Sequence, residues 1–112
     1  MDCLFCKIVE GTIPSDKVYE DEHVIGFKDI NPTSPLHLLF IPKVHFEDLS
    51  HSYGKEEELL YVFKAIRKYV IEEGLDEKGY RLVINAGEYG QQTVAHLHVH
   101  LITGRQLNWP AG

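Results

Sequence analysis

Three histidines, His96, His98 and His100, occupy alternate positions near the end of the chain, with apolar residues between them. Because successive side chains of a β-strand point to opposite faces, this alternation places the three imidazoles on one face. A helix would scatter the intervening apolar residues around its circumference, so we predict a strand. An imidazole is a nucleophile near neutral pH and can take or give a proton there. Three imidazoles in strict alternation therefore predict a functional site.

The spacing of the three histidines predicts a division of labour. Consecutive residues on one face of a strand lie about 6.6 Å apart, so the outer two Cα atoms are separated by about 13 Å. One zinc ion could bind two neighbouring histidines but hardly all three. His98, in the centre, is best placed to attack a phosphorus atom and form a covalent phosphohistidine that water later releases. We expect His100 to bind a phosphate oxygen or to assist the leaving group.

A glycine-rich loop over residues 87–93 leads directly into the histidine strand. Its backbone N–H groups, its glutamine amides and the Thr93 hydroxyl can donate hydrogen bonds to the equatorial oxygens of a reacting phosphate. A glycine-rich loop alone is more often a plain turn. Its position next to the three histidines favours a phosphate-binding role.

Hydrophobic periodicity predicts the elements that hold these residues in place. Apolar residues at positions 59, 62, 63, 66 and 70 recur at intervals of three and four, which indicates a long helix over about residues 54–73. Strands grouped around one long helix predict an α+β fold with a mostly antiparallel five-stranded sheet. The other expected elements are a short helix over residues 3–9, strands over residues 18–20, 23–28, 36–41, 80–85 and 94–103, and a loop over residues 29–35.

Length and composition limit the classes of protein to which the chain can belong. Its 112 residues, 44% hydrophobic and 25% charged, predict one globular domain over residues 1–112. A net charge of −6 argues against a general role in binding nucleic acid. Apolar runs such as Leu38 to Ile41 are far too short to span a membrane. The first residues lack the pattern of a secretory signal, so we expect a cytoplasmic location.

The chain resembles the histidine-triad (HIT) family of nucleotide-binding hydrolases and transferases, whose motif is His-x-His-x-His with apolar residues between. The motif stands here as His96-Leu97-His98-Val99-His100-Leu101. The ending of the chain is similar to the nucleotide-binding branch, the purine nucleoside phosphoramidases, rather than to the dinucleoside polyphosphate hydrolases. The other segments that carry the resemblance are residues 5–8, 13–14, 27–32, 35–37, 41–45 and 104–110.

The resemblance implies a reaction and a set of catalytic residues. His98 would attack the α-phosphorus of an adenosine phosphoramidate, giving a nucleotidyl-histidine intermediate and then AMP. His100 and Thr93 would contact the phosphate and the departing amine, and His37 would orient a group or relay a proton. The implied phosphate-binding residues also include Asn85 and Gln92.

The same resemblance implies where the nucleoside binds. The Asp29 carboxylate would take the ribose hydroxyls, although from sequence alone it could equally cap the turn at Asn31-Pro32. Trp109 would approach the pocket of a partner subunit, or else pack on its own subunit. The purine would lie against apolar residues that would otherwise be simple core: Phe5, Ile8, Phe27 and Ile30.

The family also implies a homodimer in which the sheets are joined and the long helices are paired. A chain this short has little area with which to cover both faces of its sheet, which favours the same expectation. The sequence departs from the branch at residues 91–93, where Gln-Gln-Thr replaces the frequent Gly-Gln-Ser. Thr93 keeps the hydroxyl, but Gln91 makes the loop stiffer and bulkier, which bears on the preferred leaving group.

Two cysteines three residues apart, Cys3 and Cys6, fit a metal or redox site better than a disulfide framework. Together with His45 and His96 they complete a Cys₂His₂ set for tetrahedral zinc, and superfamily members with an N-terminal Cys-x-x-Cys are similar in this. Four protein ligands would leave no open position, so the zinc would be structural. The alternative is two buried thiols and a surface His45. We expect no organic cofactor.

Two other classes of function fit the same residues. A nucleotidyl transferase or a dinucleoside polyphosphate hydrolase would use the same His98 as nucleophile. A non-enzymatic adaptor would use the histidines only to bind a nucleotide or zinc. His23 and His51 lie in polar, turn-like surroundings and receive no function.

Overall fold

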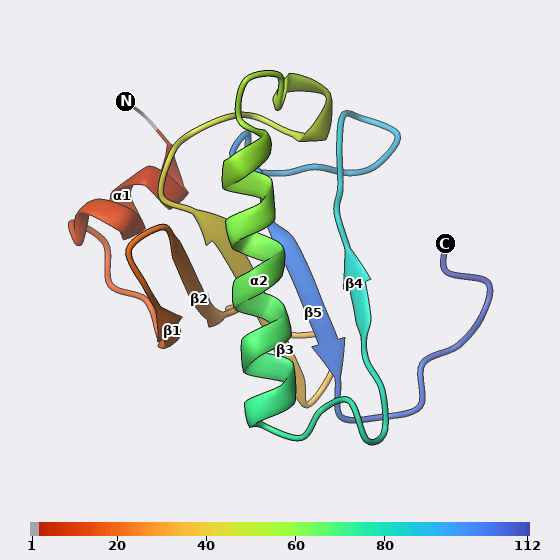
Figure 1. The fold of residues 1–112 in the computed structure, drawn as a ribbon. Helices are drawn as coiled ribbons and strands as arrows, with labels where there is room; N and C mark the ends of the chain where they lie inside the picture. Colours follow the sequence, from red (N-terminus) through yellow and green to blue (C-terminus); the bar gives the residue numbers. More distant parts are fainter. Residues whose placement is uncertain (1–2) are drawn as a thin grey trace.

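The computed structural model describes residues 3–112, and Figure 1 shows how their helices and strands are arranged. Two strands are shorter than expected, and the remaining elements agree with the predicted bounds within a few residues. In chain order the elements are α1 (Leu4–Glu10), β1 (Lys17–Glu20), β2 (Val24–Lys28), β3 (Leu36–Pro42), the 3-10 helix η1 (Leu49–His51), α2 (Glu56–Glu72), β4 (Arg81–Val83) and β5 (Val99–Thr103).

The strands form one sheet in the order β1-β2-β3-β5-β4, in which neighbouring strands run antiparallel. The predicted α+β class with an antiparallel five-stranded sheet is confirmed. β3 lies in the centre of the sheet, and its register with β5 pairs His37 with Ile102 and Leu39 with His100. His37 and His100 therefore occupy diagonal positions on the same face of the two strands.

Helix α2 covers one face of the sheet (Figure 1). Its buried residues Val62, Ala65, Ile66 and Val70 follow a helical spacing. Three glutamates in its first turn stabilise the helix, because their negative charges lie at the positive end of the helix dipole. This stripe packs on sheet residues that include Leu38 and Phe40 of β3 and Val99 and Leu101 of β5. In the part of the chain that the structure describes, no helix is long and apolar enough to cross a membrane.

Helix α1 packs against the strand residues whose side chains point to the other face of the sheet, away from α2. Phe5 and Ile8 of α1 pack with Leu39 and Ile41 of β3 and with Phe27 of β2. Because side chains alternate along a strand, these strand residues point away from those that contact α2. His37, two residues before Leu39, shares this side of β3. The candidate site therefore lies on the α1 side of the sheet.

The predicted strand over residues 94–103 is wrong in its first half, because β5 begins only at Val99. The Leu97 N–H donates to the carbonyl of Phe46 at 2.8 Å, and the His96 N–H donates to the carbonyl of Val94 at 2.9 Å, so the chain bends before it joins the sheet. β4 likewise covers residues 81–83 rather than the expected 80–85. His96 and His98 are thus held by an irregular segment, and only His100 lies within the strand.

Candidate functional site

The three histidines keep the predicted common side despite the bend. The rings of His98 and His100 meet with centroids 5.1 Å apart, and the ring of Phe5 contacts both His96 and His98 edge-on. His37 of β3 adds a fourth imidazole, whose ring centroid lies 5.1 Å from that of His100. The structure therefore brings the rings of His37, His98 and His100 together, and the ring of Phe5 joins His98 to His96.

A hydrogen bond to the backbone determines which ring nitrogen of His98 carries the proton. Its Nδ1 lies 2.8 Å from the backbone carbonyl of His96, and because a carbonyl can only accept, the ring proton must be on Nδ1. Nε2 then carries the lone pair. Burial lowers the pKa of His98 below its ordinary value, which favours the neutral ring. The side chain lines a cavity of about 570 Å³, so the ring can meet a bound electrophile.

A chain of hydrogen bonds also sets the tautomer of His100. The Thr33 backbone N–H donates to Nδ1 of His37 at 3.1 Å, so the neutral ring of His37 carries its proton on Nε2. That Nε2–H donates to Nδ1 of His100 at 2.9 Å, which leaves the proton of His100 on its own Nε2. His100 lines the same cavity as His98. The two rings thus have complementary roles, a lone pair on one and a donor on the other.

The cavity is formed by the histidines on one side and the glycine-rich loop on the other. Gly90 fits this loop because a Cβ there would lie 2.5 Å from the carbonyl oxygen of Ala86. Gln91 has a φ of 56°, a left-handed conformation that is uncommon for a residue with a side chain. The residues that line the cavity are Asn85, Tyr89, Gly90, Gln91, Thr93, His98, His100, Ala111 and Gly112.

The predicted phosphate-binding residues divide into two groups. Asn85 and Thr93 line the cavity, and the amide of Asn85 donates to the carbonyl of Gly90 at 2.6 Å. Gln92 does not line it, because its amide nitrogen donates to the carbonyls of Glu47 at 2.7 Å and Val94 at 3.0 Å. Gln92 therefore braces the loop from outside. Tyr89 lines the cavity without having been singled out, since an exposed loop tyrosine carries no sequence pattern.

The predicted nucleoside residues are not gathered into one pocket. Phe5, Ile8 and Phe27 are buried together, whereas Ile30 is 90% exposed and Trp109 is 82% exposed. Each carboxylate oxygen of Asp29 makes one contact. One carboxylate oxygen accepts the Asn31 N–H at 2.8 Å, as the capping alternative requires, and the other lies 3.4 Å from Nε2 of His37.

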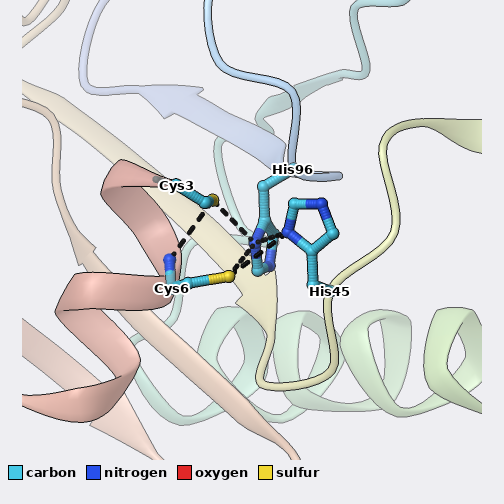
Figure 2. A group of neighbouring side chains, drawn as sticks. All are labelled: Cys3, Cys6, His45 and His96. Carbon is cyan, nitrogen blue, oxygen red and sulfur yellow. Dashed lines mark hydrogen bonds between the residues drawn. The ribbon is translucent and has the colours of Figure 1, made fainter. Parts of the chain in front are cut away.

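Cys3, Cys6, His45 and His96 direct one donor atom each toward a common point (Figure 2). Nδ1 of His96 lies 3.4 Å from Sγ of Cys3, 3.5 Å from Sγ of Cys6 and 3.1 Å from Nδ1 of His45. Tetrahedral zinc would separate two nitrogen ligands by about 3.3 Å and a nitrogen and a sulfur by about 3.6 Å. The four donors fit the shape of a small tetrahedral metal ion.

The ring orientation of His96 supports the same interpretation. Its Nε2 lies 2.9 Å from the carbonyl of Pro42, so the proton is on Nε2 and the Nδ1 lone pair faces the sulfur atoms. Burial raises the pKa of Cys6 to about 11 and lowers that of His96 to about 4. A cation among these donors would offset the cost of burying thiolates. The cluster can therefore hold a metal ion.

Asp29, His37 and His100 also place three potential ligand atoms close together. In this group the tautomer of His37 argues against a metal ion, because the Thr33 N–H that donates to Nδ1 requires a proton on Nε2, the nitrogen that faces the other two residues. A protonated nitrogen has no lone pair for a metal. We interpret this group as a hydrogen-bond chain.

Comparison with known proteins gives a consistent result. The family model described as HIT domain matches residues 10–107. The 14 kDa zinc-binding protein of Brassica juncea is 49% identical over 118 residues, which cover 99% of this chain and 100% of that protein. Adenylylsulfatase HINT1 of Arabidopsis thaliana is 48% identical over 117 residues, which cover 97% of this chain and 76% of that protein.

The fold is also found among solved structures. The crystal structure of a HIT family hydrolase from Legionella pneumophila Philadelphia 1 matches with a TM-score of 0.93 and 46% sequence identity. The match covers 99% of this chain and 100% of that one.

We predict that His100 makes the protein sensitive to acid. Burial, reinforced by neighbouring His98 and His37, lowers the pKa of His100 from 6.5 to about 4. Between these pH values the unfolded chain binds a proton that the folded chain does not, so folding stability is lost as the pH falls from 6.5 to 4. The slope from this group is at most about 1.4 kcal/mol for each pH unit. His100→Asn should flatten the dependence of the free energy of unfolding on pH, measured by urea denaturation.

His51 provides a control of opposite sign. Its ring is exposed, and a hydrogen bond to the Asp48 carboxylate raises its pKa. Its contribution is therefore present at low pH and is lost as the pH rises through the raised value. Below pH 6.5 His51 is protonated in both the folded and the unfolded chain, so His51→Asn should leave the slope between pH 4 and 6.5 unchanged and alter the slope only above pH 6.5. Equal slopes for wild type and His100→Asn would contradict the assignment of a neutral His100.

Proposed function

Because the chain belongs to the HIT domain family, we propose that it is a hydrolase of nucleoside monophosphate derivatives that cleaves the P–N bond of purine nucleoside phosphoramidates. The observation that carries the proposal is the free Nε2 of His98, which the bond from Nδ1 to the His96 carbonyl leaves unprotonated beside the cavity. The products would be AMP and an amine.

In the first step of the proposed reaction, Nε2 of His98 attacks the α-phosphorus. The new bond joins this nitrogen to phosphorus, the bond from phosphorus to the amine breaks, and its electron pair goes to the amine nitrogen. That nitrogen takes the proton from Nε2 of His100, which becomes an imidazolate whose negative charge is balanced by the positive charge on the nucleotidyl-His98 until water returns the proton. The positive charge that develops on His98, whose ring centroid lies 5.1 Å from that of His100, favours this proton transfer.

In the second step water attacks the phosphorus of the nucleotidyl-histidine. The oxygen of water joins the phosphate, the bond to His98 breaks, and a proton of the water returns to His100. One water molecule is consumed, AMP is released, and both histidines recover their starting tautomers. The Nδ1–H of His98 stays on the His96 carbonyl throughout, so the nucleophile keeps its orientation.

Residues of the cavity suggest how the substrate is held. Thr93 lines the cavity with an exposed side chain, and we propose that its hydroxyl contacts the phosphate or the departing amine. Asn85 would bind a phosphate oxygen on exchanging its bond to Gly90. Ribose binding by Asp29 stays a prediction, as do a purine site at Phe5, Ile8, Phe27 and Ile30, a phosphate contact from Gln92 and an approach of Trp109 to a partner's pocket.

We further propose that the metal ion held by Cys3, Cys6, His45 and His96 is zinc. Two thiolates and two imidazole nitrogens form a donor set that zinc prefers. Sγ of Cys6 lies 3.2 Å from Nδ1 of His45, and this distance and the three given above suit tetrahedral geometry. Zinc would supply charge and cross-linking to the N-terminal segment, with no open position for substrate. The reaction would depend on it only through the position of the His96 backbone.

A homodimer is the quaternary structure that we propose. Helix α2 carries exposed apolar residues on the side away from the sheet, namely Leu60, Phe63 and Ile71, and Leu82 lies exposed on the edge strand β4. Pairing of two such helices and of two edge strands would bury these residues and extend the sheet.

A cytoplasmic location also stays a prediction.

A second reaction at the same nucleophile is the cleavage of adenylyl sulfate, which the name of the Arabidopsis relative suggests. The exposed side chains of Tyr89, Gln91 and Thr93 leave the loop side of the cavity open to leaving groups of different shape. Analysis of the products formed from an adenosine phosphoramidate, adenylyl sulfate and a dinucleoside polyphosphate would rank the three substrates.

The nucleophile is tested by trapping the intermediate. We expect rapid mixing with an adenosine phosphoramidate, followed by acid-free peptide mass spectrometry, to map an AMP adduct to His98. His98→Ala should lower kcat by about 10⁴-fold or more while AMP still binds. His51→Ala, which alters an exposed ring outside the cavity, is the control and should keep full turnover. An adduct on another residue, or turnover by His98→Ala, would contradict the mechanism.

The zinc proposal predicts one zinc per chain by metal analysis of the purified protein. Cys3→Ser should lower the zinc content and the midpoint of thermal unfolding, because a buried ligand is lost. Substitution with Co²⁺ should give the absorption of a tetrahedral site with thiolate ligands. His51→Asn, outside the cluster, should retain the metal. A wild-type protein that is free of zinc and unaffected by added zinc would refute the assignment.

The dimer proposal predicts a mass of two chains in analytical ultracentrifugation. Phe63→Lys places a charge on the exposed face of α2 and should shift the protein toward a monomer. Leu49→Lys changes a similarly exposed residue of η1 and should leave the dimer intact. A wild-type monomer at all concentrations tested would be incompatible with the proposal.

A further inference from the structure

Arg105 contacts the loop that orients the histidines. Its Nη2 donates to the carbonyl of Thr33 at 3.1 Å and its Nε donates to the same oxygen at 3.3 Å. Two donors of the planar guanidinium therefore share one acceptor. The two residues are 72 positions apart in the sequence. The interaction ties the segment after β5 to the loop between β2 and β3.

Thr33 is the residue through which this contact reaches the active site. While its carbonyl accepts from Arg105, its N–H donates to Nδ1 of His37. The Thr33 hydroxyl also lies 3.4 Å from that nitrogen. Held in this way, Thr33 points its backbone N–H, which can only donate, at Nδ1, and this N–H keeps the proton of His37 on Nε2.

The turn before Arg105 is built for close approach to the same loop. Gly104 has a φ of +98°, and a Cβ at this position would lie 3.0 Å from Cβ of Pro35 and 3.3 Å from the Leu36 nitrogen. A residue other than glycine would push the two segments apart. The backbone therefore brings Arg105 over Thr33 with little freedom.

We propose that Arg105 is a positioning residue for proton transfer: by holding Thr33, it fixes the tautomer of His37 and so keeps on Nε2 of His100 the proton that the leaving group takes. The inference rests on the proposed function and deepens it. Arg105 does not line the cavity that holds His98 and His100. It acts through Thr33 and His37, in that order.

The chemistry makes the effect of Arg105 depend on the leaving group. When the P–N bond breaks, the amine nitrogen receives an electron pair and must take a proton, which His100 supplies and the attacking water later restores. When a bond from phosphorus to sulfate oxygen breaks, sulfate leaves as a stable anion and needs no proton. A loosened His37 tautomer should therefore slow amine release far more than sulfate release.

We do not expect loss of the Arg105 contact to change the free energy of folding, because Arg105 and Thr33 are both exposed. Exposed polar contacts of this kind contribute little to the free energy of folding. Arg105→Gln should thus fold normally. Arg81→Gln is the matched control, since Arg81 also donates to a backbone carbonyl, that of Asn108 at 2.8 Å, but has no link to His37.

The kinetic test compares an adenosine phosphoramidate of an alkylamine with adenylyl sulfate. We expect Arg105→Gln to lower kcat for the phosphoramidate by roughly tenfold or more, with KM little changed, because acid catalysis contributes about 10²- to 10⁴-fold. For adenylyl sulfate the loss should be less than about threefold on the same reasoning. Arg81→Gln should alter neither rate. Equal losses on both substrates, or none on the phosphoramidate, would overturn the inference.

The ¹⁵N chemical shifts of the His37 ring test the inference without any substrate. In the wild-type holoprotein Nδ1 should show the shift of an unprotonated nitrogen and Nε2 that of a protonated one. In Arg105→Gln both signals should move toward intermediate values, while in Arg81→Gln they should stay in place. An unchanged His37 tautomer in Arg105→Gln would refute the role of Arg105. Failure of the wild type to cleave a phosphoramidate would instead refute the proposed function.

Discussion

The hydrogen bond from Nδ1 of His98 to the backbone carbonyl of His96 is the interaction on which the rest of the site depends. It fixes which nitrogen of His98 faces the cavity, and it does so with an atom of the residue whose side chain belongs to the Cys₂His₂ cluster. The fully buried ring of His96 anchors that carbonyl. The Cys₂His₂ cluster and the orientation of the His98 ring therefore depend on one local backbone conformation.

The role of each imidazole follows from the partner of its second nitrogen. A carbonyl on Nε2 of His96 leaves Nδ1 as a lone pair for a metal, and a carbonyl on Nδ1 of His98 leaves Nε2 as a lone pair for an electrophile. An N–H on Nδ1 of His37 has the opposite effect and makes Nε2 a donor. Three chemically identical rings thus differ in which nitrogen carries the lone pair, because backbone groups, which cannot titrate, decide where each proton lies.

The sequence predicted what depends on local periodicity and missed what depends on contacts between distant segments. The spacing of Val62, Ile66 and Val70 identified α2, and the alternation of histidines identified their common side, because both patterns report burial. The early start assigned to β5 failed because the Leu97 N–H bonds to Phe46, a partner far along the chain that periodicity does not specify.

The candidate site shows the same division. Cys3, Cys6, His45 and His96 were assembled correctly because few residue types bind zinc and their number matched a ligand set. The contact of Gln92 could not be foreseen, because an amide near a phosphate loop can either face the ligand or brace the backbone, and the carbonyl of Glu47 to which it donates lies 45 residues away. The contact between Arg105 and Thr33 was missed for the same reason. In this fold, residue type predicts which atoms can react, and long-range backbone contacts determine which of those atoms are free to do so.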